Sequence, residues 1–252
     1  MPIQRLAGRF LRRRIVGQEC TWRGPALVLR LNIVCEGPTE SRIVKSILSP
    51  YLATLNVGVS APMIGTSGKK GGSVTLHRIR ANVKDCLLQD RNSYCTTLVD
   101  FYGIDGDFPG KKEAARKSIL SDKQDVVCDA FAGKLAQTLP AGPMRRFIPY
   151  VQMHEFEGLL FSDPTQLASA LRRPHLSQQF WAIRNDFETP EHIDDSPASA
   201  PSKRIQKIFP RYRKVQMGQR AARAITLDKI RDECPLFSAW LAKLEALPAL
   251  SA

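Results

Sequence analysis

The sequence predicts an α/β fold in which a mostly parallel central sheet is flanked by helices and followed by a helical extension at the carboxyl end. Two observations predict it. Short apolar runs alternate along the chain with segments in which apolar residues recur at helical spacing, as in proteins with parallel sheets. An acidic residue also follows the end of three of these runs, where open α/β sheets bind their ligands.

The first expected strand is the apolar run 27–35, which ends directly before Glu36. The segment 41–51 has apolar residues at helical spacing, and Thr39 is its candidate N-cap. Glu36 therefore leaves the carboxyl end of a strand, and Glu40 lies in the first turn of the next helix. Two carboxylates at this place suit Mg²⁺ or Mn²⁺. For Glu40 the alternative is that the helix dipole alone favours an acid there.

A weaker strand is expected over 56–64, and a glycine-rich loop follows it over 65–72. Lys69 and Lys70 in this loop could meet phosphates together with backbone amides. The spacing of a P-loop is absent, and a simple exposed turn is the alternative. A helix is expected over 73–89.

The next strand covers 94–100 and ends in Asp100. An acid at the end of a second strand is what a metal site at the sheet edge requires. Asp105 and Asp107 follow in a loop rich in glycine and proline, where turn-forming acids are common. The segment after this loop is expected to become helical from about Asp125.

A further strand is expected over 146–153, and it runs directly into His154, Glu155 and Glu157. Acids thus cluster again just beyond a strand. His154 is a candidate general acid or base, with a structural role in the packing as the alternative. Asp163 is expected to cap the helix that follows it.

From about residue 177 the chain becomes richer in loops and in positive charge. A long loop is expected over 188–202, and two short helices over 226–247, the second opening at Pro235. Between them, cations are interleaved with aromatic residues, a pattern typical of surfaces that track a phosphate backbone; a solvated helix face is the alternative. The candidate nucleic-acid-binding residues here are Lys203, Arg204, Lys207, Arg211, Arg213 and Lys214.

The composition points to a polyanionic partner. The chain has 252 residues, 37 Lys and Arg against 24 Asp and Glu, and a net charge of +13. Its 6 cysteines form no Cys-x-x-Cys pair, which argues against structural zinc and a disulfide framework. No apolar run reaches the length of a membrane span. We therefore expect a reduced, cytoplasmic protein with no membrane association.

We expect three parts in the chain. Residues 1–26 carry many arginines and are predicted to form a basic, poorly ordered extension, because the first strand begins only after them. Residues 27–175 are expected to form the catalytic core. Residues 176–252 are expected to form a loop and a basic helical region packed on that core.

Four motifs occur in order: Cys35-Glu36-Gly-Pro-Thr-Glu40, Val99-Asp100-Phe-Tyr-Gly103, Gln152-Met-His154-Glu155-Phe-Glu157-Gly158 and Ala200-Pro-Ser-Lys203-Arg204-Ile205. In this order, between about residue 30 and about residue 245, they resemble an uncharacterised bacterial Toprim-like family, domain of unknown function 4276. The acid clusters after three strands also resemble the Toprim domain, the metal-binding catalytic domain of topoisomerases, primases and OLD-type nucleases. The resemblance implies a Toprim-like, Rossmann-like sheet.

The resemblance also implies a metal-dependent nuclease that uses Mg²⁺ or Mn²⁺. Its catalytic residues would be Glu36, Asp100, Glu157 and Lys203, with Lys203 and Arg204 contacting the phosphate or stabilising the leaving group. The metal ligands would be Glu36, Glu40, Asp100, Glu155 and Glu157.

The chain departs from the Toprim pattern at one position. Tyr102 stands where the second acid of the usual Asp-x-Asp belongs. A second metal would then need Asp105, Asp107, Glu155 or Glu157, so the choice between one metal and two stays open.

The resemblance to OLD-type nucleases suggests phage defence together with an ABC/SMC-type ATPase. That ATPase would be a separate chain, because no Walker motif is present here. We expect DNA rather than RNA as the nucleic-acid partner, and a homodimer is left open. The alternatives are a non-catalytic module that binds nucleic acid or an ATPase, and phosphoryl or nucleotidyl transfer on a small substrate.

Overall fold

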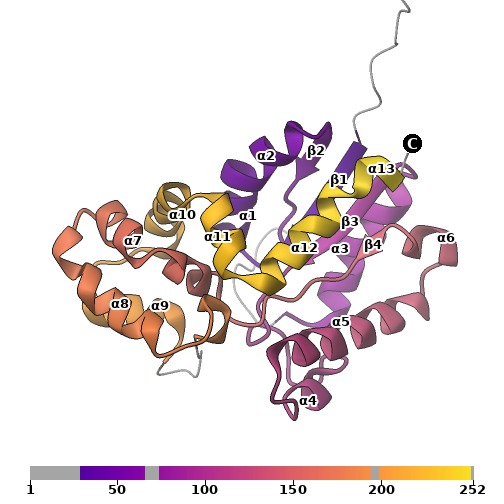
Figure 1. Ribbon diagram of the computed structural model, residues 1–252. Coiled ribbons are helices and arrows are strands. Elements are labelled where there is room, and N and C mark those ends of the chain that lie inside the picture. The colour runs from indigo at the N-terminus through magenta and orange to yellow at the C-terminus, as the bar shows by residue number, and fades with distance from the viewer. Residues whose placement is uncertain (1–28, 66–73, 194–198, 251–252) are drawn as a thin grey trace, which may run out of the picture.

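A four-stranded parallel sheet forms the centre of the computed structural model, which describes residues 29–65, 74–193 and 199–250 (Figure 1). The strand order is β2-β1-β3-β4, and every neighbouring pair is parallel. The strands are β1 Leu29–Cys35, β2 Val57–Ser60, β3 Ser93–Leu98 and β4 Phe147–Ile148. The predicted α/β fold with a parallel sheet is therefore confirmed. The expected extension 1–26, Lys69 and Lys70 lie outside the described residues.

Single bridges extend the pairing beyond the regular strands. Cys35 pairs with Met63 beyond the end of β2, and Asp100 pairs with Gln152 beyond the ends of β3 and β4. The sequence predicted longer strands over 56–64 and 146–153. The backbone there continues in the same direction but keeps only part of the regular hydrogen bonding. The bridge at Asp100 fixes the position of this acid relative to the chain that leads to Glu155.

The connection from β1 to β2 is one continuous helical run composed of α1 Pro38–Ile43, a π-helical turn Val44–Leu48 and α2 Ser49–Ala53. The prediction that Thr39 caps this helix is wrong. Gly37 is the N-cap, with extended backbone at φ −155°, and Pro38 takes the first helical position. The fixed φ of proline suits that position, so the helix begins earlier than the apolar pattern indicated.

The connections from β2 to β4 contain α3 Leu76–Gln89, α4 Lys111–Ala114, α5 Leu120–Ala136 and α6 Ala141–Met144. The helix expected from about Asp125 begins at Leu120 instead. Leu120 is buried on the same face as Val127, Phe131 and Leu135. The apolar stripe of the helix thus starts one and a half turns earlier than predicted.

The described residues after β4 are mostly helical from Phe156 onward. A 3₁₀ helix Phe156–Ser162 leads into α7 Pro164–Ala170, which Asp163 caps as predicted by accepting the Gln166 N–H at 2.9 Å. The elements after it are a 3₁₀ helix Pro174–Leu176, α8 Ser177–Asn185, a 3₁₀ helix Pro190–His192, α9 Pro201–Ile208, a π-helical turn Lys214–Gly218, α10 Gln219–Ile225, α11 Leu227–Glu233, α12 Pro235–Glu245 and α13 Leu247–Leu250. The loop expected over 188–202 is thus interrupted by the second of these 3₁₀ helices and ends where Pro201 opens α9. The two helices expected over 226–247 are confirmed, and Pro235 opens the second.

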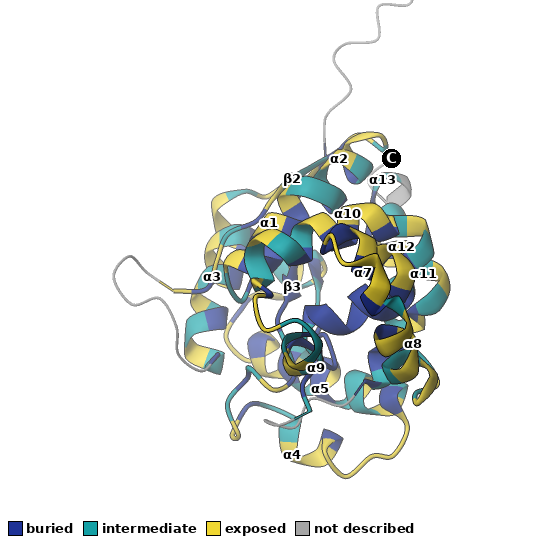
Figure 2. Ribbon diagram, turned by 90° about the vertical axis from the view of Figure 1, so that its left-hand side faces the viewer, coloured by how far each residue is buried: buried dark blue, intermediate teal, exposed yellow. Residues whose placement is uncertain are grey.

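Both faces of the sheet are covered (Figures 1 and 2). One core lies between the sheet and α3 and α5, around Val83 and Phe131. The other lies between the sheet and the helices on its opposite face, and it includes Leu31, Leu48 and Trp240. Because both faces are buried, only the ends of the strands are left for ligands. Among the described residues, no helix is long and apolar enough to cross a membrane.

Helix α12 packs on the sheet through Trp240, and Glu191 caps its first turn. The Trp240 ring stacks on Tyr150 with 4.4 Å between centroids, and its Nε1 donates to Thr96 Oγ1 at 3.0 Å. The buried carboxylate of Glu191 accepts the backbone N–H groups of Leu236 and Phe237 at 2.8 and 2.9 Å. These N–H groups have no partner within the helix, so Glu191 caps it from a distant part of the chain.

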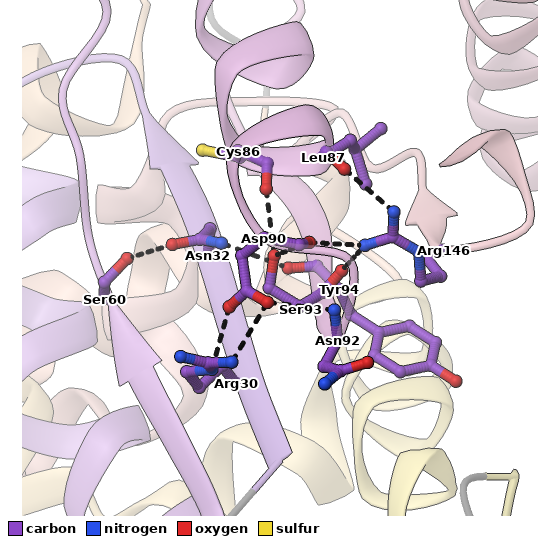
Figure 3. A network of polar contacts seen from close by, with 10 residues as sticks. All are labelled: Arg30, Asn32, Ser60, Cys86, Leu87, Asp90, Asn92, Ser93, Tyr94 and Arg146. Carbon is purple, nitrogen blue, oxygen red and sulfur yellow. Dashed lines mark hydrogen bonds and ion pairs between the residues drawn. The ribbon is translucent and has the colours of Figure 1, made fainter. Parts of the chain in front are cut away.

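A polar network closes the amino end of the sheet, opposite to the acids (Figure 3). Arg30 of β1 pairs with Asp90 at 2.8 Å. The Arg146 guanidinium donates to the carbonyl oxygens of Leu87, Asp90 and Ser93. Arg146 therefore holds the turn between α3 and β3 in place. This turn sets where β3 begins, and Asp100 lies beyond the opposite end of that strand.

Candidate metal and phosphate site

Acidic side chains follow three strands at the same edge of the sheet. Glu36 comes directly after β1, and Asp100 lies two residues after β3. Beyond β4 the chain continues to Glu155 and to Glu157 in the 3₁₀ helix. Because all the strands are parallel, their carboxyl ends meet, and the structure brings together these predicted residues with Glu40.

Glu36 is held against the chain that leaves β3. The Asp100 backbone N–H donates to Glu36 Oε2 at 3.0 Å. A Cβ atom added at Gly103 would lie 2.4 Å from Glu36 Oε1. Only glycine therefore leaves room for this carboxylate. Burial, opposed by that hydrogen bond and by Lys214, raises the pKa of Glu36.

Asp100 is at the centre of the acidic cluster. Its Oδ1 atom is buried and accepts no hydrogen bond from the described residues. Burial, followed by the charges of the four glutamates 36, 40, 157 and 155, raises the pKa of Asp100 well above its usual range. A carboxylate oxygen that is buried without a partner is costly, and a cation beside it would remove that cost.

Glu40 has a structural role in addition to any chemical one. Its Oε2 accepts the Gly37 N–H at 3.0 Å, which caps the first turn of α1. Burial, and then the charge of Glu36, raises its pKa. The helix-start interpretation of this acid is thus supported, and the charge of Glu36 acts on the same carboxylate.

Glu155 is engaged by three donors. Its Oε2 accepts the Ser202 N–H at 2.9 Å, and its Oε1 accepts Ser202 Oγ at 3.1 Å and Lys214 Nζ at 2.6 Å. Although burial opposes it, Lys214 together with Ser202 lowers the pKa of Glu155. Glu155 therefore holds Lys214 in the site, and both of its oxygens accept hydrogen bonds from the protein.

Glu157 is nearly completely buried. Lys214 Nζ lies 3.5 Å from its Oε2, while its Oε1 has no hydrogen-bond partner among the described residues. Burial raises the pKa of Glu157 to about 7 even though Lys214 opposes the shift. The two glutamates, against the effect of burial, raise the pKa of Lys214, so this lysine stays charged at neutral pH.

The donor set suits a hard divalent cation. It consists of carboxylate oxygens, and two of them, Asp100 Oδ1 and Glu157 Oε1, are buried and have no hydrogen-bond partner among the residues that the structure describes. In the described part of the chain, no three His, Cys, Asp or Glu side chains form a ready metal cage. Binding a cation therefore requires Asp100, Glu36 or Glu40 to turn toward it, and the charge of the cation would offset the repulsion between these acids.

The other acids and the histidine of the predicted site lie at its margin. Tyr102 has 51% of its surface exposed, and its ring stacks on that of His154 at 6.1 Å between centroids. His154 is thus packed beside the cluster. Asp107 is exposed, and the Asp105 backbone N–H bonds to the Val74 carbonyl at 3.1 Å.

The predicted cations divide between two places. Lys203, Lys207, Arg211 and Arg213 are exposed on α9 and the segment after it. Arg204 is engaged by the protein itself, because its Nε donates to the Ser199 carbonyl at 2.7 Å and its guanidinium lies over the Phe187 ring. Of the predicted cations that the structure describes, Lys214 alone is paired with the carboxylates.

Sequence reasoning missed how Lys214 and Ser202 serve this site. Lys214 was grouped with the surface cations because it lies in a basic stretch. A signal for Ser202 existed in the motif Ala200-Pro-Ser-Lys203, where Pro201 begins α9 and directs the Ser202 N–H outward from its first turn. The position of Gly103, three residues after Asp100, was a signal for a close backbone approach.

The fold and the site define an α/β protein with a cluster of carboxylates at the carboxyl edge of a parallel sheet. Within this class, the chain belongs to the family described as Domain of unknown function (DUF4276), which matches residues 35–245. The comparison with curated proteins gave no match.

The solved structures similar to the chain include the C-terminal regions of two OLD proteins. One is the C-terminal region of the OLD protein of Xanthomonas campestris pv. campestris, with 18% identity and a TM-score of 0.43, covering 88% of this chain and 96% of that one. The other is the C-terminal region of the Burkholderia pseudomallei OLD protein, with 14% identity and a TM-score of 0.43, covering 86% and 98%. Because the identities and TM-scores are this low, the fold is assigned from the strands and helices described above and not from these two structures.

Proposed function

We propose that the chain is a metal-dependent nuclease of Toprim type that hydrolyses phosphodiester bonds in nucleic acid, with DNA as the preferred substrate. The observation that carries the proposal is the cluster around Asp100, whose Oδ1 is buried without a partner among further acids. The chain that builds this negative centre has a net charge of +13. A basic protein with a buried acidic cluster suits a polyanionic substrate, whose phosphate can contact the acids through a cation bound between them.

The residues have distinct roles in this proposal. Asp100, Glu36 and Glu40 would hold Mg²⁺ or Mn²⁺. When bound, such an ion supplies an activated water and neutralises charge on the scissile phosphate. Lys214, held by Glu155 at 2.6 Å, keeps a second positive charge at the site. This arrangement supports a site with one metal ion and one lysine, and it gives a reason why Tyr102 can stand where a second acid is usual.

The proposal includes partners and a biological context because the acid clusters after three strands resemble the Toprim domain of OLD-type nucleases. We propose that a separate ABC/SMC-type ATPase works with the chain, in phage defence. Lys203 and the other exposed cations of α9 would contact the nucleic acid outside the reacting phosphate. A homodimer is compatible with this proposal but is not needed for it.

A non-catalytic module that binds nucleic acid is the second candidate. Two observations favour it: Tyr102 replaces the second Toprim acid, and the described residues contain no ready metal cage. In this alternative the acids would have a structural role, and only the cations would have a function.

Digestion of plasmid, linear DNA and RNA in the presence of Mg²⁺, Mn²⁺ or EDTA tests the proposal. We expect cleavage with either metal and none in EDTA, with DNA cut faster than RNA. The assay is run with the full chain, alone and with an ATPase encoded beside it. Binding without metal-dependent turnover on any substrate, in both arms, would replace the nuclease by the non-catalytic module.

A further inference from the structure

A hollow of about 410 Å³ lies beside the acid site, between the helical run that follows β1 and helix α10. Three of its lining residues are cations, namely Arg42, Lys45 and Arg223, and its lining contains no Asp or Glu. Ser46 and Gln219 add polar groups. The chemistry of the wall is therefore that of an anion site, in contrast to the acidic cluster next to it.

Helical spacing explains why these side chains converge. Arg42 and Lys45 are three residues apart and share one face of the run 38–53. Arg223 lies four residues after Gln219 on the facing side of α10. Like charges that face each other are destabilising, so an uncompensated gathering of three cations costs stability.

The described residues do not compensate these charges. Within residues 29–65, 74–193 and 199–250, no ion pair or hydrogen bond engages Arg42, Lys45 or Arg223, and all three are exposed. The Ser46 hydroxyl is buried and has no hydrogen-bond partner there. A ligand with several negatively charged oxygens would satisfy both the cations and this hydroxyl.

Both walls of the hollow are continuous with the acid site. Pro38, which lines the hollow, is two residues from Glu36 and two from Glu40. Lys45 is five residues beyond Glu40, roughly 7 Å along the helix, since each residue advances a helix by about 1.5 Å. On the other wall, α10 follows directly on the π-helical turn that begins with Lys214. The hollow thus lies about one or two nucleotides from the carboxylates.

We propose that this hollow binds the phosphodiester backbone of the substrate, next to the phosphate held at the carboxylates. The inference rests on the proposed function and adds to it a second contact that positions the strand. Arg42, Lys45 and Arg223 pair with consecutive backbone phosphates, and Ser46 donates to one of their oxygens. The cations of the hollow attract the strand and align it across the site.

The test replaces the three cations together, as Arg42→Gln/Lys45→Gln/Arg223→Gln. A matched control removes three exposed cations elsewhere, as Lys84→Gln/Lys134→Gln/Lys243→Gln on α3, α5 and α12. Both variants lose the same net charge. Fluorescence anisotropy with labelled DNA oligonucleotides in EDTA, at several NaCl concentrations, gives the affinity and its salt dependence without cleavage. Melting temperatures no lower than that of wild type establish that both variants are folded.

We expect the slope of log K against log[NaCl] to fall by about two units in the hollow variant and to stay close to wild type in the control, since each lost phosphate contact removes about 0.7–0.9 of a unit. Equal slopes in the two variants overturn the inference. A labelled mononucleotide that binds wild type and not the hollow variant, with oligonucleotide binding unchanged, also overturns it in favour of a free-nucleotide site. Because this assay measures binding and no cleavage, it tests the hollow even if the nuclease proposal fails.

Discussion

Asp100→Asn is expected to abolish metal-dependent cleavage, with a loss of roughly 10³-fold, the order seen when one group that stabilises transition-state charge is removed. The substitution keeps the shape of the side chain and removes the charge at the centre of the cluster. Affinity for nucleic acid should stay the same or rise slightly, because an acid near the phosphates is lost. Initial cleavage rates in Mn²⁺, together with anisotropy in EDTA, measure the two effects separately.

Controls for this result lie in the same loop. Asp107→Asn changes an exposed acid and should leave the rate close to wild type. Gly103→Ala should lower the rate without changing any charge, because its Cβ would displace the Glu36 carboxylate. Gly106→Ala has open space around the new Cβ and should have little effect. Undiminished cleavage in Asp100→Asn, or equal losses in both glycine variants, would contradict the assignment of the site.

The second large effect is expected from Trp240→Ala, which should lower the free energy of unfolding by about 3–5 kcal/mol. Trp240 has 2% of its surface exposed, stacks on Tyr150 and donates to Thr96, so its removal leaves a cavity and an unpaired hydroxyl. For a chain of this size we expect the melting temperature to fall by roughly 10 °C. Chemical denaturation and calorimetry measure both quantities.

Trp181→Ala is the matched control, because Trp181 has 38% of its surface exposed on α8. It should cost no more than about 1 kcal/mol, the range of an exposed side chain with one hydrogen bond. If the two tryptophan variants lose similar stability, helix α12 is not part of the core that supports the sheet.

The strands and the acids that follow them could be predicted because each depends on local sequence. A buried strand shows itself as an apolar run, and the residue after it is placed by the strand alone. Because β1 and β3 are parallel, the residues that follow them lie at the same edge of the sheet, and there the Asp100 N–H donates to Glu36. The predicted start of α1 was two residues too late. Threonine is a common N-cap, but here Pro38 takes the first helical position and makes Gly37 the N-cap.

The partner of the acids could not be predicted, because it depends on packing far along the chain. Lys214 is 59 residues from Glu155, and nothing in its neighbourhood separates it from the exposed Arg213 beside it. Its direction is set by the π-helical turn and by Ser202, which positions Glu155. The same holds for Glu191, whose role as a cap for α12 appears only when the two segments meet.

Titration of Mn²⁺ into the metal-free protein, followed by electron paramagnetic resonance at pH 8 and pH 5, tests the central claim most directly. We expect saturable binding of about one ion at pH 8, of the kind carboxylate ligands give. Binding should weaken at pH 5, because the raised pKa values of Asp100, Glu36 and Glu40 favour protonation of these proposed ligands as the pH falls, and a protonated carboxyl no longer binds the ion. Asp100→Asn should lose the site. No saturable binding in wild type, or equal binding in Asp100→Asn, would contradict a metal centre at the carboxyl edge of this sheet.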